Sequence, residues 1–343
     1  MPQAPLLHTA GLSIGYKTGK ESRVLASGLQ LDMYPGQLIC LLGPNGSGKS
    51  TLIRTLSGLQ EKLSGSVEIE GQDISGMKPV SMARKLSMVL TEKVQAGNLD
   101  AYTVIGLGRY PYTGWKGTLE EADKRVVDNA IRMTRTEAFA ARKIHQLSDG
   151  ERQRVMLARA LAQDTPVIIL DEPTAYLDLP NRISLMRLLH QLSRTTGKAI
   201  LLSTHDLELA LQTADQLWLL NLNGQLLQGV PEDLVLNGAF EAAFFTGDST
   251  FDKASGTFVI SQQGGRTVQL GGTGVPLVWT KRALLREGYL VTSGPAAESI
   301  EIIEEGTRWV YRTGQTETTC GNIERLLQVL REQPETNHNN QTQ

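Results

Sequence analysis

The chain is poor in cysteine, and its few cysteines are badly placed for a disulfide. Cys40 and Cys320 lie far apart, and Cys40 falls inside an apolar segment that we expect to be a buried strand. A disulfide framework is therefore excluded as the basis of the fold, and a reducing, cytosolic compartment is the default. The cysteines and the five histidines also show no metal-ligand spacing.

Long apolar runs and an excess of one charge are missing as well. The sequence has no run of eighteen apolar residues and no basic segment followed by an apolar one, so we expect neither a membrane span nor a secretory signal. Lys and Arg total 34 against 36 Asp and Glu, a net charge of −2 that does not indicate a nucleic-acid binder. The 343 residues, 40% of them apolar, can form a large core and favour two domains.

Residues 43–50, Gly-Pro-Asn-Gly-Ser-Gly-Lys-Ser, match the phosphate-binding pattern G-x-x-x-x-G-K-[ST] at every fixed position. The apolar segment 37–42 predicts a buried strand entering this loop, and 51–59 predicts a helix leaving it. Backbone N–H groups and the helix dipole would then surround a nucleotide triphosphate. Lys49 should reach the β- and γ-phosphates, and the Ser50 hydroxyl should bind Mg²⁺. The expected nucleotide contacts are Gly43, Pro44, Asn45, Gly46, Ser47, Gly48, Lys49, Ser50 and Thr51.

Residues 167–172, Val-Ile-Ile-Leu-Asp-Glu, form an apolar, β-branched run that ends in two carboxylates. This pattern is typical of a buried parallel strand with chemistry at its C-terminal end. Asp171 would complete the Mg²⁺ shell, and Glu172 would act as general base on the attacking water. A buried strand with a merely polar end is the alternative.

Residues 147–154, Leu-Ser-Asp-Gly-Glu-Arg-Gln-Arg, predict the start of a helix. Ser148 and Glu151 have the spacing of a capping box, with Ser148 as the N-cap residue. A helix N-terminus of this kind can bind an anion, although the segment taken alone indicates only an ordinary capped helix.

The order of these motifs resembles that of the ATP-binding subunit of ABC transporters, whose signature LSGGQ lies just before the carboxylate-bearing strand. The resemblance implies an α/β fold: a P-loop ABC ATPase with a RecA-like core, an antiparallel β-subdomain and a helical subdomain at about 91–150. It also implies a head-to-tail homodimer in which Ser148 and Gly150 contact the ATP bound by the partner subunit. Asp149 and Glu151 depart from the signature. Because a carboxylate is adverse near a triphosphate, we expect Asp149 to point away from it.

Three further segments fit the same family. Residues 173–178 resemble the D-loop, which crosses the dimer interface. Residues 199–206 resemble a strand ending in the switch histidine, so His205 would touch the γ-phosphate and orient water with Glu172. Tyr16 matches the aromatic residue that stacks on adenine, and a surface tyrosine in a strand is the less favoured alternative.

The Q-loop departs from the family pattern. The family places a glutamine after the strand that we expect at 87–90, where it touches Mg²⁺ and couples to the membrane subunits. A gapless comparison puts Glu92 in that position, where its carboxylate could contact Mg²⁺. Gln95 could serve instead if the loop is longer, and we favour Glu92.

Residues 103–115 resemble the ATPases of importers for iron–siderophore complexes, haem and cobalamin. This implies polytopic permease partners, an indirect link to a substrate-binding protein, and a peripheral position on the cytoplasmic face of the membrane. Simple packing of a helical core is the alternative for this segment. For the whole chain, the alternatives are a soluble ABC-type ATPase with a regulatory role and, less well matched, a small-molecule kinase.

The pattern changes after Phe245. We expect an ABC ATPase domain at 1–246, an α+β accessory domain at 247–332 and a disordered tail at 333–343. The accessory domain shows short strands around Gly-rich turns, a helix at 279–287 and an amphipathic helix at 322–331, without a catalytic constellation. A regulatory, ligand-sensing or dimer-stabilising role is favoured over a structural extension that packs on the ATPase core, by analogy with other appended domains.

Overall fold

The computed structural model describes residues 4–18, 21–90, 97–113, 117–244, 249–253, 255–260 and 265–332. Predictions for Glu92, Gln95, Trp115 and the tail 333–343 lie outside these residues. The chain forms two compact units. The first comprises residues 1–245 and 251–257, and the second comprises residues 246–250 and 258–343.

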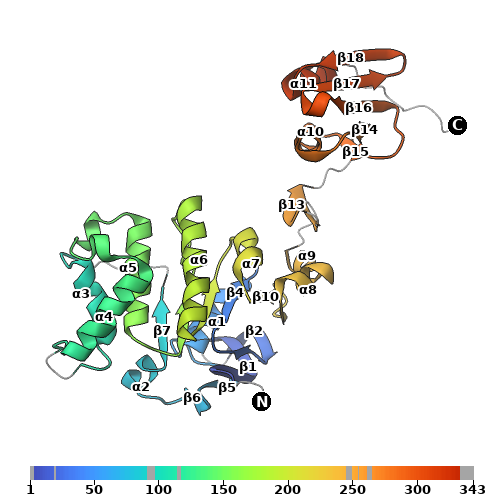
Figure 1. Cartoon of the computed structure of the whole chain (residues 1–343). Coiled ribbons are helices and arrows are strands. Elements are labelled where there is room, and N and C mark those ends of the chain that lie inside the picture. Colours follow the sequence, from blue (N-terminus) through green and yellow to red (C-terminus); the bar gives the residue numbers. More distant parts are fainter. Residues whose placement is uncertain are drawn as a thin grey trace. The chain divides into compact units, whose positions relative to one another are not determined.

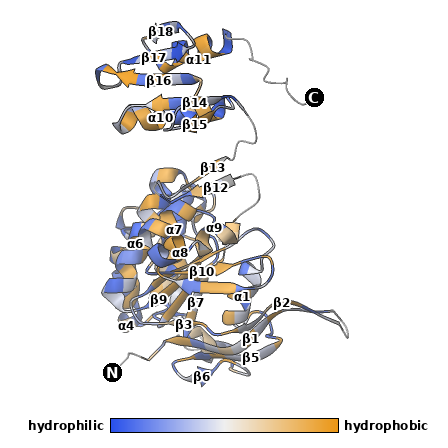
Figure 2. Cartoon of the chain, turned by 90° about the vertical axis from the view of Figure 1, so that its right-hand side faces the viewer, coloured by the Kyte–Doolittle hydropathy of each residue, from blue (hydrophilic) through white to orange (hydrophobic). Residues whose placement is uncertain are grey.

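A mainly parallel sheet forms the centre of the first unit (Figure 1). Its strand order is β11-β10-β4-β9-β8-β7, with only the edge strand β11 antiparallel. Strands β4, β8 and β9 are buried along their whole length, as the unbroken apolar runs predict. In Figure 2 the hydrophobic colour is prominent around β9 and β10, while the helices beside them show both hydrophobic and hydrophilic segments. The bounds are β11 Leu226–Gly229, β10 Gln216–Leu220, β4 Leu38–Leu42, β9 Ala199–Ser203, β8 Val167–Leu170 and β7 Leu86–Val89.

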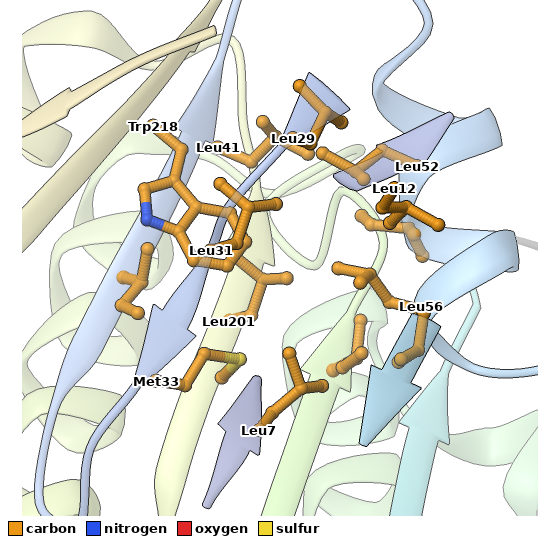
Figure 3. Packing of buried hydrophobic residues seen from close by; sticks show 14 of the residues in the cluster. Leu7, Leu12, Leu29, Leu31, Met33, Leu41, Leu52, Leu56, Leu201 and Trp218 are labelled. Carbon is orange, nitrogen blue, oxygen red and sulfur yellow. The ribbon is translucent and has the colours of Figure 1, made fainter. Parts of the chain in front are cut away.

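A second, antiparallel sheet packs against the first through the main hydrophobic core (Figure 3). Side chains such as Leu7 and Leu12 from β1 meet Leu201 and Trp218 from the parallel sheet, and all four are buried. Burying one leucine contributes about 1.5–3 kcal/mol, so this contact fixes the sheets against each other. The strands are β1 Leu7–Thr18, β2 Glu21–Leu29, β3 Asp32–Met33, β5 Ser64–Ile69 and β6 Gln72–Asp73.

The helical part of the first unit contains α3 Ala101–Gly106, α4 Glu121–Thr134 and α5 Asp149–Ala162. Arg109 holds these elements together. Its Nε donates to Asp123 Oδ1 at 2.9 Å, its Nη1 donates to the Ala162 carbonyl at 3.0 Å, and the guanidinium stacks on Tyr112. Gly108 allows this approach, since a Cβ there would lie 2.3 Å from the Arg159 carbonyl oxygen. Arg109 and Gly108 therefore pack the helical core, whereas the neighbouring Tyr110 is 73% exposed.

Replacing Arg109 by Met is expected to lower the free energy of unfolding by about 3–5 kcal/mol, because it leaves the Asp123 carboxylate buried and unpaired. Urea denaturation measures this. Arg125→Met, an exposed substitution on the same helix α4, is the matched control. Adding Asp123→Leu to Arg109→Met should recover most of the loss, and failure to recover it would contradict the ion-pair explanation.

The second unit is built on a mixed sheet in the order β15-β14-β16-β17-β18, which packs with helices α10 and α11 around its own core. Arg266 donates to Glu298, whose other oxygen accepts from the Tyr311 hydroxyl at 3.1 Å. Burial is the main reason that the pKa of Tyr311 is raised to about 12. The bounds are β14 Thr267–Gly271, α10 Gly274–Arg286, β15 Leu290–Thr292, β16 Glu298–Ile303, β17 Arg308–Thr313, β18 Thr316–Cys320 and α11 Ile323–Glu332; a short hairpin of β12 Ser249–Asp252 and β13 Thr257–Ile260 precedes them.

Three elements after residue 248 differ from the sequence prediction, and the first is the short strand β12, which falls where we expected a polar linker. Strand β18 was not predicted, because it is an edge strand in which only Cys320 is buried and no apolar alternation is visible. Helix α10 begins at Gly274, five residues before the predicted start at 279. Gly274 and Pro276 are poor helix formers in a helix interior, but proline is tolerated in the first turn, where its missing N–H is not needed.

Candidate active site

The predicted site residues meet at one edge of the parallel sheet. Strand β4 leads into the loop 43–48, β8 into Asp171 and Glu172, and β9 into His205. These strands are neighbours in the order β4-β9-β8 and run parallel, so their carboxyl ends lie side by side. The crevice outside the carboxyl ends of parallel strands is where open α/β sheets bind ligands.

The loop 43–48 closes tightly before helix α1 Lys49–Leu56. A Cβ on Gly43 would lie 2.1 Å from the Leu220 carbonyl oxygen, and Gly48 adopts a left-handed φ of 105° as the N-cap of α1. Only glycine fits both positions without strain. The buried Ser47 Oγ has no hydrogen-bond partner among the described residues. The loop thus places polar groups where phosphate oxygens would complete their hydrogen bonding.

Lys49 is the central cation of the site. Its Nζ donates to the carbonyl oxygens of Gly43 at 2.7 Å and Pro44 at 3.2 Å, and the residue is only 6% exposed. Burial lowers the pKa of Lys49 below its ordinary value, while the carboxylates of Glu172 and Asp171 oppose that shift. An anionic ligand at this position would further favour the charged ammonium.

Ser203 organises the two carboxylate residues, and the sequence analysis gave it no role. Its hydroxyl donates to Asp171 Oδ1 at 2.7 Å and accepts from the Glu172 backbone N–H at 2.9 Å. The signal was available, since Ser203 is a hydroxyl residue at the end of the buried strand β9, next to the strand that carries the carboxylates. Glu172 has a left-handed φ of 48°, a conformation that is uncommon for a residue other than glycine and that clusters at functional sites.

The structure brings His205 and Glu172 together. The distance between His205 Nε2 and Glu172 Oε1 is 2.8 Å, which suits a hydrogen bond from the imidazole N–H to the carboxylate. Both residues line a cavity of about 420 Å³ together with Thr174, Ala175 and Arg182. A carboxylate oriented by an imidazole beside an open cavity can accept a proton from a water held there.

Tyr16 also reaches this region. Its hydroxyl lies 2.7 Å from the Thr51 Oγ1 on helix α1, and Tyr16 is 50% exposed. A hydrogen bond to a residue of α1 therefore fixes an exposed aromatic ring beside the loop 43–48.

The predicted capping box at the start of α5 is confirmed. Ser148 Oγ accepts from the Glu151 backbone N–H at 3.3 Å, and Glu151 Oε2 accepts from the Ser148 backbone N–H at 2.8 Å. The latter bond is the main cause of the lowered pKa of Glu151. Asp149 forms an ion pair with Arg152 on its own helix, N···O 3.0 Å. Gly150 packs closely on α6, Leu179–Thr196, where a Cβ would lie 3.1 Å from Asn181.

Comparison with known proteins identifies the family. Residues 26–175 match the "ABC transporter" family model, and residues 265–331 match the "Iron ABC transporter C-terminal domain" model. An uncharacterised ABC transporter ATP-binding protein of Methanocaldococcus jannaschii is 34% identical over 297 residues, covering 85% of this chain and all of the relative. An achromobactin transport ATP-binding protein of Dickeya dadantii is 35% identical, covering 68% of this chain and 85% of the relative. A cobalamin import ATP-binding protein of Halobacterium salinarum is 34% identical, covering 77% of this chain and 68% of the relative.

A solved structure supports the same assignment. A dimeric ATP-binding cassette in a post-hydrolysis state, bound to ADP and Pi, superimposes with a TM-score of 0.56 and 26% identity, covering 66% of this chain and 98% of the cassette. The chain therefore has the ABC ATPase fold. It belongs to the ATP-binding proteins of ABC transporters and is an ATPase that binds nucleotide. None of the helices that the structure describes is both long and apolar enough to cross a membrane.

Proposed function

We propose that this chain is the ATP-hydrolysing subunit of an importer for an iron chelate or cobalamin. The match of residues 265–331 to the iron ABC transporter C-terminal domain carries the proposal. The achromobactin transport and cobalamin import relatives support it. A soluble, purely regulatory ATPase is not favoured, because the named relatives serve transport. In this role the chain lies peripherally on the cytoplasmic face of the membrane.

The site residues take the following roles. The loop 43–48 and Thr51 hold the phosphates of ATP, Lys49 neutralises their charge, and the exposed ring of Tyr16 stacks on adenine. Glu172 accepts the proton of the attacking water. His205, at 2.8 Å from Glu172, orients that carboxylate and contacts the γ-phosphate.

Ser50 and Asp171 would hold Mg²⁺. A hydroxyl and a carboxylate are the oxygen donors that this ion prefers, and the Ser203 hydroxyl fixes the Asp171 carboxylate. Bound Mg²⁺ would neutralise charge on the phosphate oxygens. Glu92 remains our choice for the Q-loop contact with the metal, with Gln95 as its alternative.

Two chains act together in this proposal. Ser148 and Gly150 at the start of α5 would contact the ATP on the partner's loop 43–48 in a head-to-tail homodimer. The ion pair of Asp149 with Arg152 supports this arrangement, since it compensates the carboxylate charge next to the signature serine. The solved cassette of the same fold is dimeric.

We also propose that residues 247–332 form an accessory domain that regulates or stabilises this dimer.

A groove on the first unit suits the membrane subunits. It has a volume of about 580 Å³ and includes four methionines, Met77, Met82, Met88 and Met156. Methionine-rich surfaces adapt to the apolar face of a bound helix. Arg159 lines the groove as well, and its burial lowers its pKa. We propose that a polytopic permease inserts a helix here, with the substrate-binding protein engaged only through the permease.

Leu59→Glu tests this surface. Leu59 lines the groove and is 63% exposed, so a carboxylate there should prevent docking without unfolding the chain. The variant is co-expressed with its permease and purified in detergent. The amount of permease that co-purifies should fall about tenfold or more below the wild-type amount, which corresponds to a loss of roughly 1.4 kcal/mol in binding free energy. Leu236→Glu, at an exposed leucine of helix α8 Pro231–Leu236, is the control. Equal retention by both variants would place the permease elsewhere.

A further inference from the structure

Arg182 connects two loops of the active site. It lies in the first turn of α6, whose N-cap is Asp178, and α6 packs beside α7, Leu207–Thr213 (Figure 1). Arg182 Nε donates to the Leu177 carbonyl oxygen at 2.7 Å, while Nη1 lies 3.6 Å from Asp206 Oδ2. One guanidinium thus bonds to the D-loop, 173–178, and forms an ion pair with the residue directly after His205.

The backbone around His205 is held on both sides by these contacts. Before it, the Thr204 hydroxyl lies 3.3 Å from the Thr174 hydroxyl. After it, Asp206 pairs with Arg182 and caps α7 by accepting from the Leu209 N–H. Asp206 also donates its backbone N–H to Thr204 Oγ1 at 3.1 Å. Thr174 is part of the D-loop, and Arg182 bonds to it. A change in the position of the D-loop is therefore transmitted to His205 through these contacts.

A role in stability does not explain Arg182. Its side chain is 42% exposed, and an ion pair of this exposure contributes about 0–1 kcal/mol. Orientation is the larger effect, because the planar guanidinium can bond a carbonyl and a carboxylate at once in a fixed geometry. Among the described residues, no other cation lies within ion-pair distance of Asp206.

We propose that Arg182 is a positioning residue for hydrolysis. It holds His205 at hydrogen-bond distance from Glu172 when the D-loop is in place, so that a partner subunit contacting the D-loop acts on this pair through Arg182. The inference rests on the proposed function, since it requires Glu172 and His205 to direct water in an ABC dimer.

The test compares ATP hydrolysis by variants of the full chain. Arg182→Gln should lower kcat about tenfold and leave KM for ATP within about twofold, since it displaces the hydrolytic pair and not the loop 43–48. Asp206→Asn should lower kcat about threefold, because Asn still caps α7 but cannot pair with the cation. The double variant should be no slower than Arg182→Gln alone, since both changes break one connection. The kcat of Arg182→Lys should lie between the values of the wild type and Arg182→Gln. This variant serves as the test if Arg182→Gln does not fold.

The control is Arg187→Gln, an exposed arginine on the same helix that has no ion pair among the described residues and should hydrolyse ATP at the wild-type rate. Equal kcat values for Arg182→Gln and Arg187→Gln would overturn the inference. A rise in KM parallel to the loss of kcat, or multiplicative effects in the double variant, would overturn it as well. Glu172→Gln is measured beside them. If it abolishes hydrolysis while Arg182→Gln does not change it, the proposed function stands and only the positioning role is lost.

Discussion

Glu172→Gln is expected to lower kcat for ATP hydrolysis by roughly 10²–10⁴-fold, the usual contribution of a general base. The amide keeps the size of the side chain and can still meet His205 at the distance that the carboxylate has now, 2.8 Å. It cannot accept a proton from water. Because Lys49 and the loop 43–48 are unchanged, the affinity for ATP should stay within about threefold of the wild-type value. Phosphate release at saturating ATP measures the rate, and ATP titration of the same protein measures the affinity.

Glu208→Gln is the matched control for this experiment. Glu208 lines the same cavity on helix α7, so removing its charge changes the local electrostatics without removing the residue next to His205. Its kcat should remain close to that of the wild type. If Glu172→Gln and Glu208→Gln hydrolysed ATP equally well, the general base would have to be another group.

The sequence predicts the fold class and the family well, because the informative residues follow one another along the chain. The loop 43–50 and the pair Asp171 and Glu172 each stand directly after an apolar strand, so local pattern is enough. The comparisons confirm the family to which these motifs point.

Contacts between distant segments could not be predicted in the same way. Ser203 bonds two residues that lie more than thirty positions earlier. Arg182 on helix α6 pairs with Asp206, the N-cap residue of helix α7. Neither contact leaves a periodic signal. Arg109 illustrates the opposite case. The segment 103–115 was interpreted through its resemblance to membrane-coupled ATPases, but its Arg109 is buried and packs the helical core. Residues with tertiary partners are thus assigned only once the strands and helices are placed.

Ser148→Arg should abolish ATP hydrolysis, lowering the rate by at least about 100-fold, as expected when groups that position a transferring phosphoryl are lost. A bulky cation at the start of α5 would displace Ser148 and Gly150 from the nucleotide that the partner subunit binds in the proposed dimer, and it would affect only the site that this α5 faces. Loss of the α5 cap contributes only about 1 kcal/mol, so the chain should remain folded. Thermal melting monitors the fold, and Glu151→Gln, which preserves the capping box, should retain activity.

Mixing two inactive chains then separates a head-to-tail dimer from a monomeric catalyst. Lys49→Ala removes the central cation of the loop 43–48 but keeps Ser148, whereas Ser148→Arg keeps Lys49. A mixed dimer therefore contains one site in which both halves are intact. At equal concentrations, independent sites and random pairing restore about a quarter of the wild-type rate, because half of the dimers are mixed and each has one intact site of two. The restored rate should rise with the square of total chain concentration at low concentration. A mixture that stays inactive while wild type is active would mean that Ser148 does not act on the partner's nucleotide, because only contact across the interface lets one chain supply what the other lacks.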